Sequence, residues 1–173
     1  MQIALADVNN NTMLNFGYWD QSTISPLAAQ IELCRVVGEF ADLQSATKII
    51  DLGSGFCAPA ALWKYMYDNK ILDIVCVDIN LKQLTAAMEK ITMYSTTPLS
   101  RSDLFYNYVV NTNIEVCKRT KSKNIVLPLV NATATTLPFA DNCVDRIIAL
   151  ESAQHFKPLS KFLRESKRVL TSE

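Results

Sequence analysis

Apolar residues along this chain follow two patterns, short continuous runs and stripes with helical spacing. A continuous run of roughly four to eight apolar residues is typical of a strand buried on both faces of a parallel sheet. We predict such strands at residues 47–51, 72–77, 125–130 and 143–150. Apolar residues that recur every three or four positions are typical of amphipathic helices. We predict helices at residues 25–40, 59–68, 81–91 and 159–170.

The order of these elements predicts the fold class. Strands that alternate with helices indicate βαβ units, in which crossover helices join parallel strands. We therefore predict an α/β fold with a doubly wound, mostly parallel sheet. Ser25 and Pro26 support the first helix, because serine caps helix N-termini and proline fits the first helical position.

Two parts of the chain depart from this alternation. Residues 95–124 are longer than an ordinary connection, and we interpret them as an insertion that contains a helix from Ser102 toward Cys117. The chain also ends at Glu173, directly after a helix, where a doubly wound sheet usually continues with further strands. We expect an open sheet edge there, and therefore self-association into a homo-oligomer.

The composition indicates one globular domain over residues 1–173. The chain has 173 residues, of which 49% are hydrophobic, and its 17 basic residues balance its 17 acidic residues. A nucleic-acid-binding protein normally has a basic excess, so we expect no nucleic-acid partner. No apolar stretch is long enough to span a membrane and the N-terminus has no secretory pattern, so we expect a cytoplasmic protein. The five cysteines form no Cys-x-x-Cys pair, so we expect neither a metal site nor a disulfide framework.

The segment Asp51-Leu-Gly53-Ser-Gly55 carries the first candidate chemistry. Two glycines between a strand and a helix let the backbone approach a ligand closely, and the helix N-terminus supplies N–H donors. Asp78 ends the next predicted strand, where a carboxylate can accept hydrogen bonds from both hydroxyls of a ribose. This arrangement indicates a ligand that contains a nucleoside.

Two classes of nucleoside cofactor are consistent with these glycines. Gly53, Gly55 and Ala58 fit the Gly-x-Gly-x-x-Gly/Ala pattern of nucleotide-dependent dehydrogenases. Asp51 argues against that class, because its negative charge repels a pyrophosphate and attracts an ammonium group. S-adenosylmethionine carries an ammonium group, a sulfonium and a ribose, and so it suits Asp51 and Asp78 together.

Six motifs in this order resemble those of the class I S-adenosylmethionine-dependent methyltransferases. The most similar branch includes tocopherol, sterol and cyclopropane-synthase-like enzymes. The motifs are residues 15–19, 51–55, 77–79, 131–145, 150–156 and 163–170. The resemblance implies methyl transfer from S-adenosylmethionine to a small-molecule or lipid acceptor, with S-adenosylhomocysteine as the product. Residues 1–45 would then form an N-terminal helical lid over the cofactor.

The resemblance also implies roles for individual residues. The residues expected to bind the cofactor are Tyr18, Trp19, Asp51, Gly53, Gly55, Asp78, Ile79, Asn131, Ala132 and Glu151. Glu151 and His155 are the candidate catalytic residues on the acceptor side. His155 is the only histidine of the chain, and it could act as a general base or could simply line the pocket or the core. Tyr18 and Trp19 could likewise be core aromatics.

The chain departs from the family pattern in two respects. Asn131 stands where the family usually has Asp beside the adenine, and its amide oxygen could still accept a hydrogen bond from the adenine amino group. The C-terminal strands that normally follow Leu170 are missing from the sequence. These departures leave an alternative function, that of a shortened, catalytically inactive relative that binds the cofactor and serves as a partner subunit.

Overall fold

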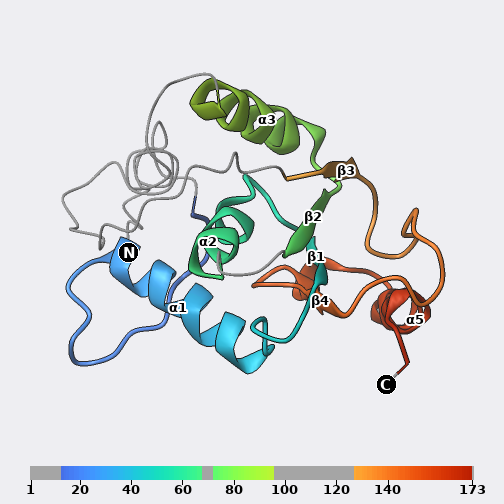
Figure 1. The fold of residues 1–173 in the computed structure, drawn as a ribbon, viewed down its shortest axis with the longest axis horizontal. Coiled ribbons are helices and arrows are strands. Elements are labelled where there is room, and N and C mark those ends of the chain that lie inside the picture. The colour runs from blue at the N-terminus through green and yellow to red at the C-terminus, as the bar shows by residue number, and fades with distance from the viewer. Residues whose placement is uncertain (1–12, 68–71, 96–126, 173) are drawn as a thin grey trace.

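The computed structural model describes residues 13–67, 72–95 and 127–172 (Figure 1). Within these ranges, parallel strands form a four-stranded sheet in the order β3-β2-β1-β4. The strands are β1 (Lys48–Leu52), β2 (Asp73–Asp78), β3 (Leu129–Asn131) and β4 (Arg146–Ile148). The predicted α/β fold with a parallel sheet is confirmed.

β1 occupies the central position, with β2 on one side and β4 on the other. Asp51 of β1 is in register with both Cys76 of β2 and Ile148 of β4, and Asp78 of β2 is in register with Asn131 of β3. The strand order therefore reverses at β1. In open α/β sheets, such a switch point at the carboxyl ends of the strands is the usual place for a ligand.

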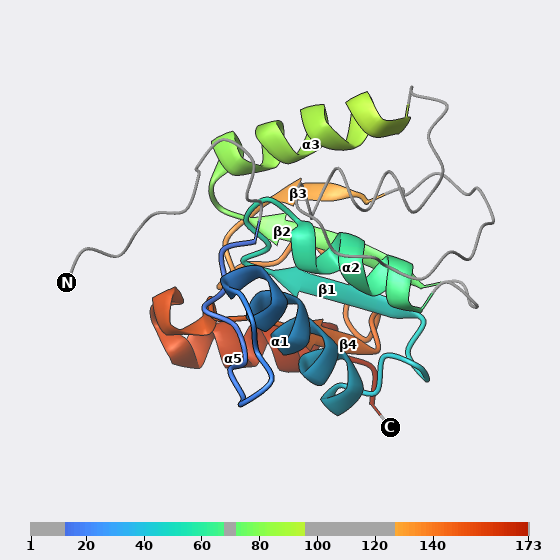
Figure 2. The same cartoon turned by 90° about the vertical axis from the view of Figure 1, so that its left-hand side faces the viewer.

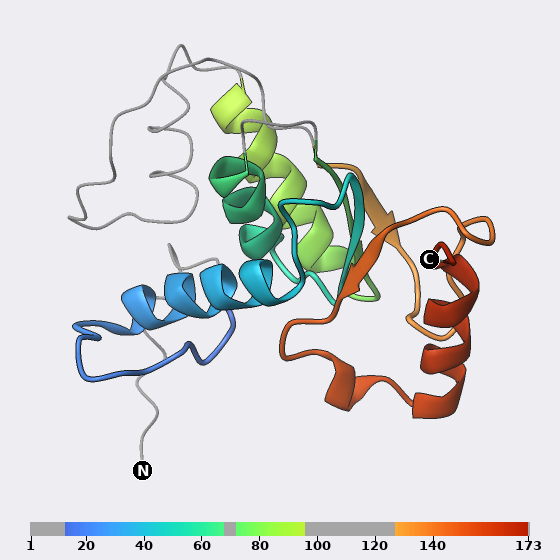
Figure 3. The same cartoon turned by 60° about the horizontal axis from the view of Figure 1, so that its bottom comes forward.

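Helices cover both faces of the sheet (Figures 2 and 3). They are α1 (Pro26–Phe40), α2 (Ala58–Met66), α3 (Leu81–Ser95) and α5 (Leu159–Val169). One buried cluster, which includes Ile49 and Trp63, joins the sheet to α1, α2 and α3. A second cluster, which includes Ile50 and Phe162, joins the other face to α5. Ile49 and Ile50 point to opposite faces, as successive residues of a strand do.

The helices begin close to the predicted positions. The Ser25 hydroxyl accepts a hydrogen bond from the N–H of Ala28 at 3.1 Å, and Pro26 follows it in the first helical position, so this predicted N-cap is confirmed. α2 begins at Ala58, one residue earlier than predicted, after Cys57 in the left-handed conformation. Differences of one or two residues at helix ends are ordinary.

β4 is shorter than the strand predicted at residues 143–150, because the residues before it have other partners. The N–H of Val144 donates to the carbonyl of Val169 at 3.2 Å, and Val144 forms an isolated parallel bridge with Leu170. The N–H of Thr171 donates in turn to the carbonyl of Val144 at 2.9 Å. Residues 169–171 therefore lie beside the chain just before β4, at the edge that the sequence analysis expected to be open.

Almost all of the expected insertion, including the helix from Ser102 toward Cys117, lies outside the described residues. Within the described ranges, no helix is long and apolar enough to cross a membrane. In the same ranges, no three His, Cys, Asp or Glu side chains are grouped so that they could hold a metal ion.

Candidate functional site

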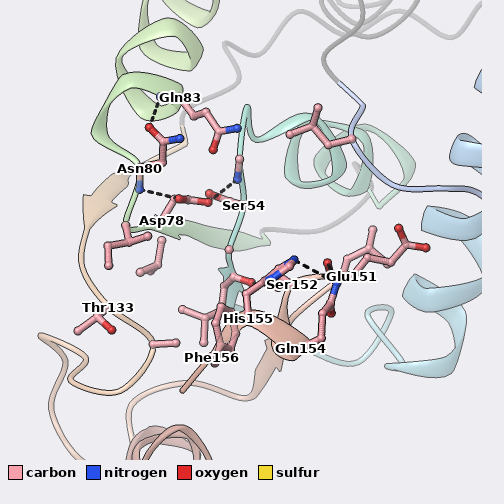
Figure 4. A pocket seen from close by; sticks show the side chains of 18 of the residues that line it. Ser54, Asp78, Asn80, Gln83, Thr133, Glu151, Ser152, Gln154, His155 and Phe156 are labelled. Atoms are coloured by element: carbon pink, nitrogen blue, oxygen red, sulfur yellow. Dashed lines mark hydrogen bonds between the residues drawn. The ribbon is translucent and has the colours of Figure 1, made fainter. Parts of the chain in front are cut away.

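A cavity of about 670 Å³ lies at the carboxyl ends of β1, β2 and β4. This volume is within the usual range of small-molecule and cofactor pockets, roughly 300–1,000 Å³. The segments that line it are residues 14–16, 52–55, 77–80, 132–135, 150–152 and 154–157, together with Pro59 and Gln83. Figure 4 shows polar side chains from these separate segments gathered around the cavity. The cavity thus occupies the switch point of the sheet.

The turn between β1 and α2 can be built only with glycine at its first position. Gly53 and Gly55 have φ angles of 75° and 55°, which side chains disfavour. A Cβ on Gly53 would lie 2.5 Å from the Cβ of Ser152 and 2.7 Å from its Oγ. The loop after β4 therefore packs directly on this turn, and both glycines line the cavity.

The backbone N–H groups of this turn donate to acceptors of the protein itself. Those of Gly53 and Ser54 donate to the carbonyl of Val77 at 2.7 and 3.2 Å, and that of Gly55 donates to the Asp78 carboxylate at 2.8 Å. The sequence analysis expected N–H donors for a ligand at this position. These three amides are already used, so a phosphate group would not find donors among them.

Asp78 lies at the end of β2 with its carboxylate held in place. One oxygen accepts the N–H of Gly55 at 2.8 Å and the other accepts the N–H of Asn80 at 2.7 Å. The side chain is mostly buried, yet it lines the cavity. An ionised carboxylate has about four acceptor positions. Asp78 therefore keeps acceptor capacity for hydroxyl groups of a ligand.

Asp51 lies beneath the glycine turn and does not line the cavity. It is only 2% exposed, and its Oδ2 has no hydrogen-bond partner among the described residues. Burial, followed by the negative charge of Asp78, raises the pKa of Asp51 from 3.8 to about 7. A donor or a positive charge brought close to this oxygen would favour its ionised form.

The N-terminal segment forms one wall of the cavity. Leu14, Asn15 and Phe16 line it, whereas Tyr18 and Trp19 do not. Tyr18 and Trp19 are about half exposed, so they are not core aromatics. The indole N–H of Trp19 donates to the Phe16 carbonyl at 2.9 Å, so Trp19 contacts the wall from outside the cavity lining.

The two candidate catalytic residues both line the cavity, in the loop after β4. Glu151 has a left-handed φ of 49°, and its carboxylate accepts the N–H of Phe16 at 2.8 Å. His155 ends the short 3-10 helix η1 (Ala153–His155), is exposed, and has its Nε2 3.5 Å from the Gln154 amide nitrogen. The structure thus brings an exposed imidazole to the same cavity as Asp78.

Three of the residues expected to bind the cofactor lie next to Asp78 in different ways. Ile79 and Ala132 line the cavity next to Asp78, but Asn131 does not. The Asn131 side-chain amide donates to the carbonyls of Asp78 and Ile79 at 2.9 and 3.0 Å. Asn131 therefore fixes the backbone that presents Asp78 and Ile79.

The sequence analysis missed several residues that line the cavity. They are Ser54, Asn80, Gln83, Thr133, Thr135, Ser152 and Phe156. Asn80 could have been found from its place two residues after Asp78, where a backbone N–H can cap the preceding carboxylate. The Ser152 hydroxyl donates to the carbonyl of Leu52 at 2.7 Å, a contact across 100 residues that no local pattern reveals.

These residues fit S-adenosylmethionine better than a dinucleotide. Asp78 presents a prearranged acceptor for ribose hydroxyls, and Asp51 contributes a buried oxygen that has no hydrogen-bond partner in the described part of the chain. A cation lowers the electrostatic energy of two neighbouring carboxylates, whereas a pyrophosphate raises it. The turn amides donate to acceptors of the protein itself, and this strengthens the preference for S-adenosylmethionine.

Comparisons with known proteins show which proteins this chain resembles. Residues 96–173 match the family described as "Methyltransferase domain". The structure superposes on the crystal structure of an S-adenosylmethionine-dependent methyltransferase from Aquifex aeolicus with a TM-score of 0.56 and 19% identity, over 80% of this chain and 58% of that one. The chain has the class I methyltransferase fold. The crystal structure of the 4+2 cyclase SpnF is also similar, with a TM-score of 0.65 and 19% identity over 91% of this chain and 47% of that one.

Two curated relatives are named as methyltransferases. Erythromycin 3''-O-methyltransferase of Saccharopolyspora erythraea is 25% identical over 91% of this chain and 42% of its own length. Methyltransferase GfsG of Streptomyces halstedii is 26% identical over 91% of this chain and 46% of its own length. The chain therefore spans less than half the length of these curated relatives.

Proposed function

We propose that the protein binds S-adenosylmethionine in this cavity and transfers its methyl group to a small-molecule acceptor. The observation that carries the proposal is the position of Asp78, whose carboxylate lines the cavity while the Gly55 amide and the Asn80 amide hold it in place. In this geometry Asp78 can accept hydrogen bonds from a ribose, whereas the turn amides already have acceptors and cannot bind a phosphate. A dehydrogenase site also uses a carboxylate for the ribose, but it needs the turn amides free to bind the pyrophosphate.

Several residues of the chain would hold the cofactor. Asp78 would accept the ribose hydroxyls, while Ile79 and Ala132 would contact the adenine. Asp51 would compensate the positive charge of the ammonium group through its ionised form. The cofactor supplies an electrophilic methyl group on a sulfonium, whose sulfur leaves as a neutral thioether.

The acceptor side of the cavity would be formed by the loop after β4. His155 lines it with an exposed imidazole, the side-chain type whose ordinary pKa lies nearest neutrality, and could take a proton from an acceptor hydroxyl or amine. Phe156 and Leu14 provide apolar surface that would help to orient the acceptor. Most of the protein's contribution to such a reaction is alignment of the acceptor atom with the methyl group.

A small-molecule acceptor is supported by the relatives and by the cavity. One curated relative is named for a methyl transfer to erythromycin, a small molecule. The cavity is large enough for a cofactor and part of an acceptor, and its lining mixes apolar side chains with a few polar ones. Because a fold hosts several chemistries, as the likeness to a cyclase illustrates, the test must detect methyl transfer itself.

The experiment supplies S-adenosylmethionine with a labelled methyl group and a panel of macrolactones, sugars and lipids that carry free hydroxyls. We expect label in at least one acceptor, and a loss of about 100-fold or more in His155→Gln if the imidazole takes the proton. Asp73→Asn is the matched control, since Asp73 lies exposed at the opposite end of β2 from Asp78. Binding of S-adenosylhomocysteine without label in any acceptor would favour the inactive, cofactor-binding alternative.

A further inference from the structure

The wall of the cavity formed by residues 14–16 is attached to the rest of the protein on two sides. On one side it is tied to α1, where the side-chain amide of Gln30 donates to the carbonyl of Asn15 at 2.7 Å and the N–H of Tyr18 donates to the carbonyl of Ala29 at 2.8 Å. On the other side, the N–H of Phe16 donates to the Glu151 carboxylate at 2.8 Å. The second attachment joins the N-terminal segment to the loop after β4.

Glu151 is held in an unusual conformation that directs this attachment. Its φ of 49° lies in the left-handed region, which non-glycine residues adopt rarely and at a cost in energy. The Glu151 carbonyl accepts a hydrogen bond from the side-chain amide of Gln154 at 2.6 Å. The hydroxyl of the next residue, Ser152, donates a hydrogen bond to the Leu52 carbonyl. Both contacts fix the turn, so that the carboxylate has a defined place at the cavity edge.

The Glu151 carboxylate acts as a hydrogen-bond acceptor for the wall. Phe16 is 77% exposed, so the wall gains little stability from burial of that ring. The bond to Glu151 ties the wall to the loop after β4, in addition to the hydrogen bonds that tie it to α1.

We infer that Glu151 is a positioning residue that holds the wall of residues 14–16 closed over the cavity and thereby slows the release of bound cofactor. The release part of this inference rests on the proposed function. The positioning part does not, because it concerns the unliganded protein. Glu151 acts through the Phe16 backbone, so it is distinguished here from a catalytic residue.

Chymotryptic cleavage measures the position of the wall without any ligand. Phe16, Tyr18 and Trp19 are cleavage sites in or beside the wall, and exposed Phe40 at the end of α1 is an internal reference. Cleavage tracks the population of the open form when opening is fast. Loss of a bond worth one or two kcal/mol changes such a population about 5- to 30-fold.

The variants distinguish the effect of losing the hydrogen bond from the effect of relieving the backbone strain at Glu151. We expect Glu151→Ala and Glu151→Gly to be cleaved about 5- to 30-fold faster than the wild type at residues 16–19, relative to Phe40. Glycine relieves the left-handed strain, so this variant should open the wall without a loss of melting temperature. Glu151→Gln keeps an acceptor oxygen and should restore slow cleavage to within about threefold. Glu89→Ala, at an exposed glutamate on α3, is the matched control.

The same variants test cofactor release by stopped-flow dissociation of S-adenosylhomocysteine. We expect the dissociation rate of Glu151→Ala to rise by the same factor as the cleavage rate and that of Glu151→Gln to stay near the wild-type rate. The positioning role would be overturned if Glu151→Ala were cleaved at the wild-type rate, or if Glu151→Gln were cleaved as fast as Glu151→Ala. Failure of the wild type to bind S-adenosylhomocysteine would instead refute the proposed function, while the cleavage result would still decide the role of Glu151.

Discussion

The carboxylate of Asp78 accepts the backbone N–H of Gly55 at 2.8 Å and so connects the end of β2 to the turn after β1. The carbonyl of Val77, one residue earlier, accepts the N–H groups of Gly53 and Ser54. These hydrogen bonds hold the two strand ends together without a ligand. They leave oxygens of the Asp78 carboxylate, and not the amide hydrogens of the turn, available at the cavity, and this determines which cofactor class fits.

Substitution of Gly53 tests how closely the loop after β4 packs on the turn. We expect Gly53→Ala to lower the free energy of unfolding by about 2 kcal/mol or more, because a left-handed alanine is strained and its Cβ would overlap Ser152. Urea denaturation measures the change. Ser152→Gly removes both overlapping atoms, so the double variant should lose less stability than the sum of the single variants. Simple additivity would show that the overlap does not matter.

The buried position of Asp51 predicts a pH dependence of stability. Its pKa is about 7 in the folded protein, against 3.8 as the ordinary value. Between these values the folded state holds a proton that the unfolded state has lost, so stability falls as the pH rises from about 4 to about 7, by at most about 1.4 kcal/mol per pH unit. Asp51→Asn should remove this contribution. Urea denaturation of both proteins across the window checks it, and parallel curves would contradict it.

Glu165 does not obscure that comparison. The hydrogen bonds from Arg168 and from the N–H of Leu137 lower its pKa from 4.5 to about 2, so its contribution changes mainly between these values and meets the Asp51 window only at its lower end. The difference between the wild type and Asp51→Asn isolates Asp51 from such groups.

Asn131 offers a test on which the structure and the family pattern disagree. The family pattern has Asp at this position, so the sequence alone predicts that Asn131→Asp leaves cofactor binding intact or tightens it. In the structure the amide donates to the carbonyls of Asp78 and Ile79, which an ionised Asp cannot do. We expect Asn131→Asp to weaken binding of S-adenosylhomocysteine about 5- to 30-fold. Asn142→Asp, at an exposed turn, is the control, and tighter binding by Asn131→Asp would disprove this role.

Local patterns predicted the parts of the fold that depend on local interactions. The Ser25 cap and the Asp51–Gly55 segment are short, and each residue type there has a direct conformational reason. The length of β4 could not be predicted, because Val144 pairs with Val169 and Leu170 near the chain end instead of continuing the strand. Such a competition between partners is not visible in the apolar pattern.

Seven of the eleven predicted site residues line the cavity, whereas Tyr18, Trp19, Asp51 and Asn131 do not. Gly53, Gly55, Asp78, Glu151 and His155 all line the cavity, as a common site requires. The sequence could not show that Asp51 is buried beneath the turn. Nor could it show the bond from Phe16 to Glu151, which joins residues 135 positions apart and depends on how the whole chain folds.

The most direct test of the cofactor assignment is a calorimetric titration of the protein with S-adenosylhomocysteine and, separately, with NAD. We predict that the wild type and the control Asp73→Asn bind S-adenosylhomocysteine with equal affinity and that NAD binds far more weakly. Asp78→Asn should bind S-adenosylhomocysteine roughly 10- to 150-fold more weakly, because it loses a charged acceptor. Tighter binding of NAD, or unchanged affinity of Asp78→Asn for S-adenosylhomocysteine, would contradict the assignment.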